Sequence, residues 1–523
     1  MREKNFVKSA TLLAASTIIA KFIGACYRIP LNNILGPEGM GLYQLVFPVF
    51  SLLLTLSSGA IPSAMSIMIS QKRAMGENTK KFFFTCLITL SVIGFLVSFL
   101  LILFAEQIAA LQANPMSYTG YLVIAPSIFF VSVMAVFRGY YMGVKNMVPP
   151  AISQISEGVI KLVAGLFFAR YFIIRGLEFG VMGALLGVTI SEIVTLIILF
   201  VMYREKESIK NYATIDEMRT NLKDLFRIAA PLTLGGIILP LSLFLDSIVI
   251  INVLKINQSV SSATLDYGLL SGTVAPIINL PIMLTLTLGI AVVPMISEER
   301  ISRDLEGIKQ KITMCVKLAL TVGAPFSLLY IFLAENILSL LYPGLSAAQL
   351  ATASTIMRIE SFNIIFLSLG QIYSSLLQAL GRVKQPVTIL FVCVVIKTAL
   401  SVVLMRFFGI AGAALASLSA FLINAIFNII IMQNLIGKVP QIVKDTSLIA
   451  ISGAILSMVV FGMSFLLSDY WAIFVILPIS GLAYIIALLA IGVFSQSELK
   501  SLPLSTIWIK IDKIFRRNKN AVT

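Results

Sequence analysis

Apolar runs long enough to cross a membrane follow one another along almost the whole chain, separated by short polar connections. A helix that spans the hydrocarbon core needs about 20 mostly apolar residues. Hydrophobic residues make up 58% of the 523 residues and charged residues only 12%, which is far from the composition of a soluble protein. The longest polar connection, roughly 203–227, is too short and too charged to hold a core of its own. The sequence therefore predicts an all-α polytopic membrane protein.

The positions of the cations predict how the chain is oriented. The apolar runs give fourteen predicted transmembrane helices: 9–30, 41–70, 82–105, 118–143, 149–172, 178–203, 228–252, 267–297, 312–333, 352–380, 385–408, 409–434, 446–468 and 470–494. With the N-terminus in the cytoplasm, the outer connections contain only Arg170, Arg175, Lys255 and Arg406, whereas the inner ones are rich in Lys and Arg. By the positive-inside rule we expect a multi-pass protein of the cytoplasmic membrane with both termini in the cytoplasm. The first run is too long for a signal peptide and is interpreted as a retained span.

The composition gives no indication of catalysis or of nucleic-acid binding. The net charge of +15 is explained by topology, because no basic stripe with interleaved aromatic residues is present. Histidine is absent, which removes the usual proton shuttle and metal ligand. The four cysteines are widely spaced inside apolar runs and fit neither a disulfide framework nor a zinc site. We therefore expect no enzyme, no metal and no cofactor.

An internal repeat divides the chain into two similar halves. Residues 143–165 resemble residues 381–401, with Pro150 paired to Pro386 and Lys161 to Lys397. The two copies are six predicted spans apart, an even number, so the halves share one orientation and predict two six-helix bundles related by a pseudo-two-fold axis along the membrane normal. The predicted domains are an N-terminal bundle (1–220), a C-terminal bundle (221–436), two additional helices (437–496) and a basic amphipathic cytoplasmic tail (497–523) on the anionic inner leaflet.

Ionisable residues inside the predicted spans are the candidates for function. A charge at a helix centre that faces lipid costs roughly 3 kcal/mol, so such residues are expected to face protein, water or the interface. Glu157 and Lys161 are four residues apart and can neutralise each other, which leaves a structural and a functional pair both open. Arg138 and Glu192 can cross-link neighbouring helices. Arg358 and Glu360, near the outer end of their span, can reach the interface.

Lys21, Arg28 and Asp246 have no such explanation. Lys21 and Arg28 are two helical turns apart on one face, with no acid within four residues. Asp246 is the lone charge near the middle of the seventh span, which is the repeat equivalent of the first. We predict that these residues meet at a cleft between the bundles, where a guanidinium suits phosphate oxygens and Asp246 serves as counter-ion or coupling-ion site. The candidate substrate-binding residues are Arg28, Lys21, Asp246, Lys161, Glu157, Arg138 and Lys397.

The motifs also resemble a known family. "AKFIGACYRIPLNNILGPEGMGLYQLVFPVF" (20–50), "FRGYYMGVKNMVPPAISQISEGVIKL" (137–162) and "GIAGAALAS" (409–417) are similar to the stage V sporulation protein B family of the multidrug/oligosaccharidyl-lipid/polysaccharide exporter superfamily, which is related to the lipid II flippases. The resemblance implies the two-bundle fold with two added helices. In the lipid II flippases the first span carries arginines, which Lys21 and Arg28 resemble. Their eighth span carries another arginine, whereas this chain has Pro276 in the corresponding region and no cation there.

The leading hypothesis is a flippase that exports an undecaprenyl-pyrophosphate-linked glycan precursor for peptidoglycan, spore cortex or another envelope polysaccharide by alternating access. A coupling ion, Na⁺ or H⁺, or the membrane potential would drive it, and envelope-synthesis enzymes would be its partners. The alternatives are a multidrug or organic-cation exporter of the same superfamily, an intramembrane enzyme, and a scaffold for envelope synthesis. Cations on the first span favour the flippase over the organic-cation exporter.

Overall fold

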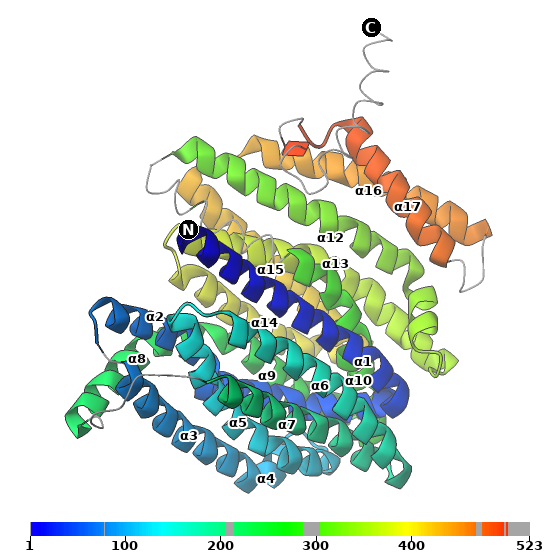
Figure 1. Ribbon diagram of the computed structural model, residues 1–523. Coiled ribbons are helices and arrows are strands. Elements are labelled where there is room, and N and C mark those ends of the chain that lie inside the picture. Colours follow the sequence, from blue (N-terminus) through cyan, green and yellow to red (C-terminus); the bar gives the residue numbers. More distant parts are fainter. Residues whose placement is uncertain are drawn as a thin grey trace. The chain divides into compact units, whose positions relative to one another are not determined.

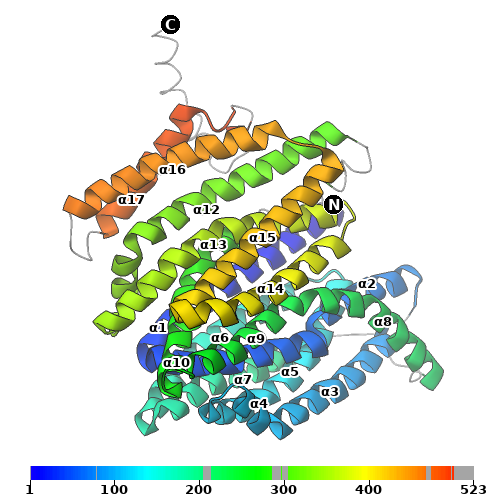
Figure 2. The ribbon, with the colours of Figure 1, turned by 180° about the vertical axis from the view of Figure 1, so that it is seen from behind.

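All regular elements that the structure describes are helices, which confirms the all-α membrane fold (Figures 1 and 2). The computed structural model describes residues 2–77, 79–203, 214–285, 296, 304–466, 473–495 and 498–499. The main helices are α1 (Arg2–Leu54), α2 (Ile61–Ala74), α3 (Thr79–Leu103), α4 (Ala105–Leu111), α5 (Tyr118–Gly143), α6 (Val148–Phe172), α7 (Leu177–Met202), α8 (Ile215–Gly236), α9 (Ile238–Leu254), α10 (Val260–Gly268), α12 (Leu305–Leu341), α13 (Ala347–Ala379), α14 (Lys384–Phe408), α15 (Ile410–Ile436), α16 (Pro440–Leu466) and α17 (Ile473–Ile491). Short 3₁₀ and π elements are η1 (Thr55–Gly59), η2 (Pro115–Ser117), η3 (Ile173–Arg175) and η4 (Leu269–Val274).

The boundary between the first two predicted spans is a single residue. Gly36 has φ +69° and ψ 174° inside α1, and helical structure resumes immediately after it. Glycine adopts a positive φ without steric cost, and Pro37 is well suited to the first turn of the following helix. The polar connection predicted for residues 31–40 is therefore wrong, because the first helix continues beyond Pro30 and the second begins directly after the break.

The described helices account for most of the predicted spans. Eleven are long and apolar enough to cross a membrane, or twelve if α8 and α9, which are bent by 44° at Ile237, form one span. The helix from Leu12 to Ala74 is one of these eleven although Gly36 interrupts it. The predicted seventh span, 228–252, is thus two helices, and the part of the eighth beyond Thr285 lies almost wholly outside the described residues. The count of fourteen stays a prediction, as do the domain boundaries and the amphipathic tail, of which the structure describes only 498–499.

One compact unit extends from Met1 to Pro276 and is called the N-terminal unit below. In it α6 packs on α7 and α1, α5 packs on α3 and α7, and the second part of α1 packs on α10 and η4. Two glycines allow the last contact: a Cβ at Gly268 would lie 1.8 Å from the carbonyl oxygen of Pro37, and one at Gly41 would lie 2.0 Å from that of Thr264. Just before the break, Asn32 also donates to the Thr273 hydroxyl of η4 at 2.8 Å.

The other compact unit extends from Ile277 to Thr523 and is called the C-terminal unit. Its centre is α13, which packs on α12 and α15, while α14 packs on α15. The helices α16 and α17 pack on each other and on α12. Both views show the pair lying along the side of α12 (Figures 1 and 2).

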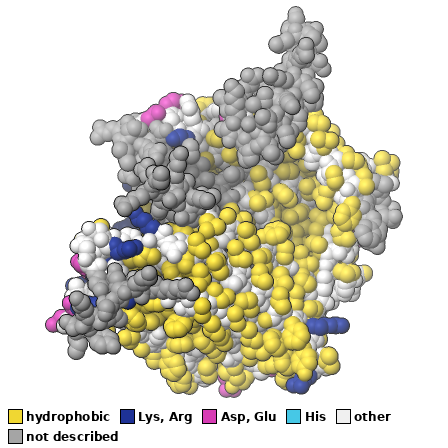
Figure 3. Space-filling view, viewed as in Figure 1, with side chains coloured by type: hydrophobic (Ala, Val, Ile, Leu, Met, Phe, Trp, Pro, Cys, Tyr) yellow, Lys and Arg dark blue, Asp and Glu magenta, His cyan; other side chains and the backbone are white. Residues whose placement is uncertain are grey.

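The helices present apolar side chains outward, as expected in lipid. Large hydrophobic residues such as Phe95, Phe167, Phe200, Met458 and Phe465 are exposed. In the lower part of the space-filling view hydrophobic side chains cover the surface, and Lys and Arg appear at its edges (Figure 3). A surface of this kind would aggregate in water, so the exposed apolar faces agree with a multi-pass membrane protein.

Candidate functional site

The candidate site begins with the close packing of α1 against α6. The Thr17 hydroxyl donates to Gln154 Oε1 at 2.8 Å. A Cβ at Gly158 would lie 3.5 Å from Ile23, and one at Gly165 would lie 2.5 Å from the Tyr27 hydroxyl. Gly158 and Gly165 are seven residues apart, so small residues recur on the face of α6 that α1 covers. This contact fixes the position of Arg28, one residue beyond Tyr27, relative to α6.

Two cations converge on the ring of Phe47. The Arg28 guanidinium carbon lies 5.9 Å from the ring centroid and Lys161 Nζ lies 5.0 Å from it. Phe47 in turn stacks on Tyr43, with 5.7 Å between ring centroids. Arg28 precedes the break at Gly36 and Phe47 follows it, so this break brings two parts of α1 together with α6. The negative face of an aromatic ring attracts cations and holds them within about 6 Å.

The acids of α6 and α7 lie near these cations, and only the acid of α6 forms an ion pair among the described residues. Glu157 Oε2 accepts from Arg138 Nη2 at 2.7 Å, and Arg138 Nε donates to the Ser153 hydroxyl at 2.9 Å. Arg138 therefore cross-links α5 to α6, as predicted. The predicted pair of Glu157 with Lys161 is wrong, because Arg138 is the better placed partner and Lys161 turns to Phe47.

Glu192 on α7 is 4% exposed and interacts electrostatically with Glu157, Arg138 and Lys161. Its Oε2 has no hydrogen-bond partner among the described residues. Within those same residues Arg28 and Lys161 have no carboxylate within 4.0 Å. The group formed by Arg28, Phe47 and Lys161, called the Phe47 site below, thus has two cations with no carboxylate at ion-pair distance in the described part of the chain.

The other predicted site residues lie elsewhere. Lys21 is exposed on α1. Asp246 is half-buried on α9, where its charge acts on Tyr267 of α10. Lys397 is buried on α14 in the C-terminal unit. The structure therefore brings together Arg28, Lys161, Glu157 and Arg138, and the cleft between two bundles stays a prediction.

Two residues of interest were missed by the sequence analysis. Phe47 lies in an ordinary apolar run, and nothing in its neighbourhood marks it as a contact for cations. Lys317 lies inside the predicted span 312–333 but is absent from the candidate residues, and the structure places it in α12 with 4% exposure. The recurrence of Gly158 and Gly165 was the one available signal that α6 is approached closely by another helix.

Comparison with known proteins places the chain in a family. The family model described as "Polysaccharide biosynthesis protein" matches residues 6–300, more than half of the chain. The chain belongs to the polysaccharide biosynthesis protein family. A second model, MatE, matches residues 231–403. The first match covers every residue of the Phe47 site.

Two relatives and one solved structure match most of the chain. Stage V sporulation protein B of Bacillus subtilis is 26% identical over 96% of this chain and 99% of its own length, which confirms the predicted resemblance. Lipid II flippase MurJ of the same organism is 24% identical over 87% of each chain. A solved structure titled "Lipid II flippase MurJ, inward closed conformation" has a TM-score of 0.72 and 18% identity, with 91% of this chain and 98% of that chain covered. This last likeness shows that the two proteins share a fold.

Proposed function

We propose that this family member moves an undecaprenyl-pyrophosphate-linked glycan precursor across the cytoplasmic membrane by alternating access. The observation that carries the proposal is the Phe47 site, where Arg28 and Lys161 lie 5.9 and 5.0 Å from one ring. A diphosphate offers oxygens to both side chains, because a guanidinium binds phosphate in a planar fork and an ammonium binds it as a point charge. The curated relative named lipid II flippase supports this class of substrate.

The energy of an intramembrane cation supports a binding role for these residues. Each would cost roughly 3 kcal/mol at a helix centre in lipid, and the attraction of an aromatic ring returns only about 1–2 kcal/mol. An anionic head group would supply the remaining stabilisation only when it is bound. Two cations with no carboxylate within 4.0 Å among the described residues are therefore better explained by an anionic substrate than by packing. A membrane potential, worth about 2.3 kcal/mol per charge per 100 mV, or a coupling ion such as Na⁺ or H⁺ would drive the cycle.

Flipping should depend on both cations of the Phe47 site. In proteoliposomes with labelled lipid II or another polyprenyl-pyrophosphate sugar, we expect Arg28→Ala and Lys161→Ala each to slow transfer by about tenfold or more, since a charge-assisted hydrogen bond contributes roughly 1.5–3 kcal/mol. Arg175→Ala is the matched control, because this arginine also lies 5.6 Å from a phenylalanine ring but on the exposed η3 turn. If both Arg28→Ala and Lys161→Ala transfer the lipid at the wild-type rate, the Phe47 site is not the substrate-binding site. If the native protein transfers no such lipid, the proposed flippase function is wrong.

Export of organic cations is the second candidate. The match of MatE to residues 231–403 favours it, and so do the buried carboxyl of Glu192 and the half-buried Asp246 in the same unit as the Phe47 site. Such an exporter would bind its substrate through acids, so Glu192→Gln should abolish drug efflux and Arg28→Ala should leave it intact. Efflux with that pattern would replace the flippase proposal.

The orientation in the membrane is part of the proposal. We infer that both termini are cytoplasmic, which rests on the small number of Lys and Arg in the outer connections. Cysteines introduced next to Arg175 should then react with an impermeant reagent added outside intact cells, and cysteines next to Lys145 should not. The reverse pattern would contradict the orientation. Envelope-synthesis enzymes that make or use the glycan precursor would be its partners.

A further inference from the structure

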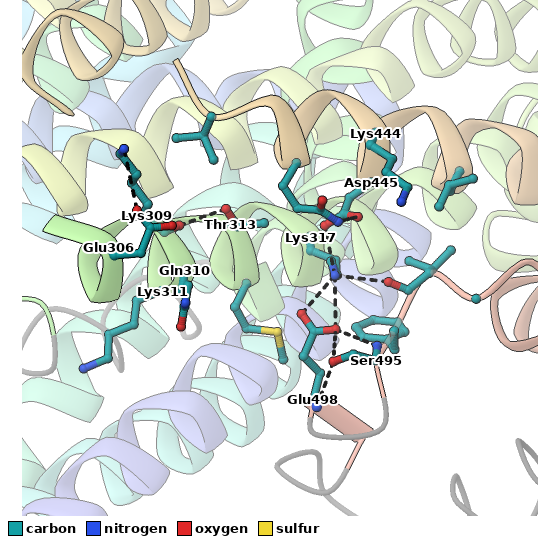
Figure 4. Close-up of a pocket in the computed structure, with 17 residues that line it drawn as sticks. Glu306, Lys309, Gln310, Lys311, Thr313, Lys317, Lys444, Asp445, Ser495 and Glu498 are labelled. Atoms are coloured by element: carbon teal, nitrogen blue, oxygen red, sulfur yellow. Dashed lines mark hydrogen bonds and ion pairs between the residues drawn. The ribbon is translucent and has the colours of Figure 1, made fainter. Parts of the chain in front are cut away.

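A buried lysine in the C-terminal unit joins three segments of the chain. Lys317 Nζ on α12 lies 2.9 Å from Asp445 Oδ2 on α16 and 2.9 Å from Glu498 Oε1 (Figure 4). It also donates to the carbonyl oxygen of Val493 at 3.1 Å, just beyond the end of α17. Lys317 and Asp445 are each 4% exposed. We call these four residues the Lys317 cluster.

The acids of the cluster are themselves held in place. Gln441 donates to Asp445 Oδ1 at 2.8 Å, and Glu498 accepts from the backbone N–H of Ser495 at 2.7 Å. Burial alone would raise the pKa of Glu498, but the Ser495 hydrogen bonds and the Lys317 ammonium hold this pKa below its ordinary value. The Glu498 carboxylate is therefore held in its charged form, and both it and the Asp445 carboxyl group face the same ammonium.

The helices that the cluster joins otherwise meet through apolar and small residues. The pair α16–α17 packs on α12, while large apolar residues such as Met458, Phe461, Phe465 and Leu466 are exposed. In lipid the hydrophobic effect does not drive one helix onto another, so close packing of small residues and polar contacts decide the association. Along this interface Gly453 approaches Leu328, and the Tyr484 hydroxyl donates to the carbonyl oxygen of Thr321 at 3.2 Å. The Lys317 cluster is the one charged contact among the described residues of the interface.

We propose that Lys317 is a positioning residue that fastens the α16–α17 pair and the segment after it to α12, so that the three helices move as one body. The cluster joins the start of α16 to the segment beyond the end of α17, so it closes the hairpin at its open end. A buried ammonium that loses its partners is strongly destabilised, and the same holds for the buried Asp445 carboxyl group, whereas Glu498 is 26% exposed and loses less. Opening the hairpin therefore requires all three charges to be exposed together. This inference does not depend on what the protein transports.

The accessibility of Val493 tests the proposal directly. Val493 is buried, and a cavity of about 760 Å³ lined by residues such as Lys309 and Lys444 borders the cluster, so a reagent can reach position 493 once the segment opens. In full-length protein without its four native cysteines, Val493→Cys should react slowly with a maleimide. Lys317→Met should raise the rate by about tenfold or more, because labelling of a buried site tracks the open population. Lys317→Arg, which keeps the charge, should restore most of the protection.

Two further variants separate opening from unfolding. The triple variant Lys317→Met/Asp445→Asn/Glu498→Gln removes the unpaired charges, so we expect it to regain thermal stability while Val493→Cys still labels fast. Lys309→Met is the matched control. Lys309 lies on the same helix and lines the same cavity, but its acidic partner Glu306, 3.8 Å away, is exposed. A cysteine at buried Ser361 of α13 should stay protected in every variant. Slow labelling at position 493 in both the single and the triple variant, or equally fast labelling at 361, would overturn the proposal.

Discussion

Replacing Gly268 with alanine should destabilise the protein by about 3 kcal/mol, although alanine is normally the better residue in a helix. A Cβ at position 268 would lie 1.8 Å from the carbonyl oxygen of Pro37 and 2.7 Å from the backbone nitrogen of Gly41. Both neighbours are backbone atoms, so neither can rotate away, and α10 must move off α1. That movement would also stretch the 2.8 Å hydrogen bond from Asn32 to Thr273. Thermal unfolding of the purified protein in detergent measures the loss.

Gly24→Ala is the matched control for this prediction. Gly24 also lies in α1, but a Cβ there would meet nothing within 4 Å, so alanine should leave stability unchanged or raise it by up to about 1 kcal/mol. Gly41→Ala should behave like Gly268→Ala, because its Cβ would lie 2.0 Å from the carbonyl oxygen of Thr264. The double variant should lose less than the sum, since both changes disturb one contact. Equal stability of the Gly268 and Gly24 variants would contradict the close approach of α1 and α10.

The membrane fold could be predicted from the sequence because its main determinant is local. A run of about 20 apolar residues has to become a helix in lipid, where no other partner exists for its backbone. The ends of the individual helices are harder to predict, because apolar composition alone does not locate a break of one residue. Gly36, with φ +69°, separates two helical segments that together form α1. The Gly-Pro dipeptide at positions 36 and 37 marks it better than hydropathy does.

The candidate site could be predicted only in part, because its contacts join residues far apart in the sequence. Arg28 stood out as a charge without a nearby acid, and the structure indeed leaves it without one among the described residues. Lys161 had an acid four residues away, yet Glu157 is held by Arg138 on another helix. Lys317 lay at the edge of an apolar run, where a solvated lysine is the ordinary interpretation, and its partner Glu498 follows 181 residues later. Pairing across helices has no local signature.

Arg138→Met should destabilise the N-terminal unit by about 2 kcal/mol. Removing one partner of a fully buried ion pair costs about 3–5 kcal/mol, and the 18% and 31% exposure of Arg138 and Glu157 reduces that cost. The change would leave the Glu157 carboxylate without its partner at 2.7 Å. Adding Glu157→Gln should restore more than half of the loss, because the unpaired carboxylate is then gone. Thermal unfolding of the single and double variants in detergent gives both values.

The Lys72–Glu77 pair provides the control, because its 2.8 Å separation matches that of Arg138 and Glu157 while Glu77 is 49% exposed. Lys72→Met should cost no more than about 0.5 kcal/mol, since exposed pairs contribute little. Equal losses in the two single variants would mean that burial adds nothing to the Arg138 pair. A double variant no more stable than Arg138→Met alone would assign the contribution of Arg138 to its 2.9 Å hydrogen bond with Ser153 instead.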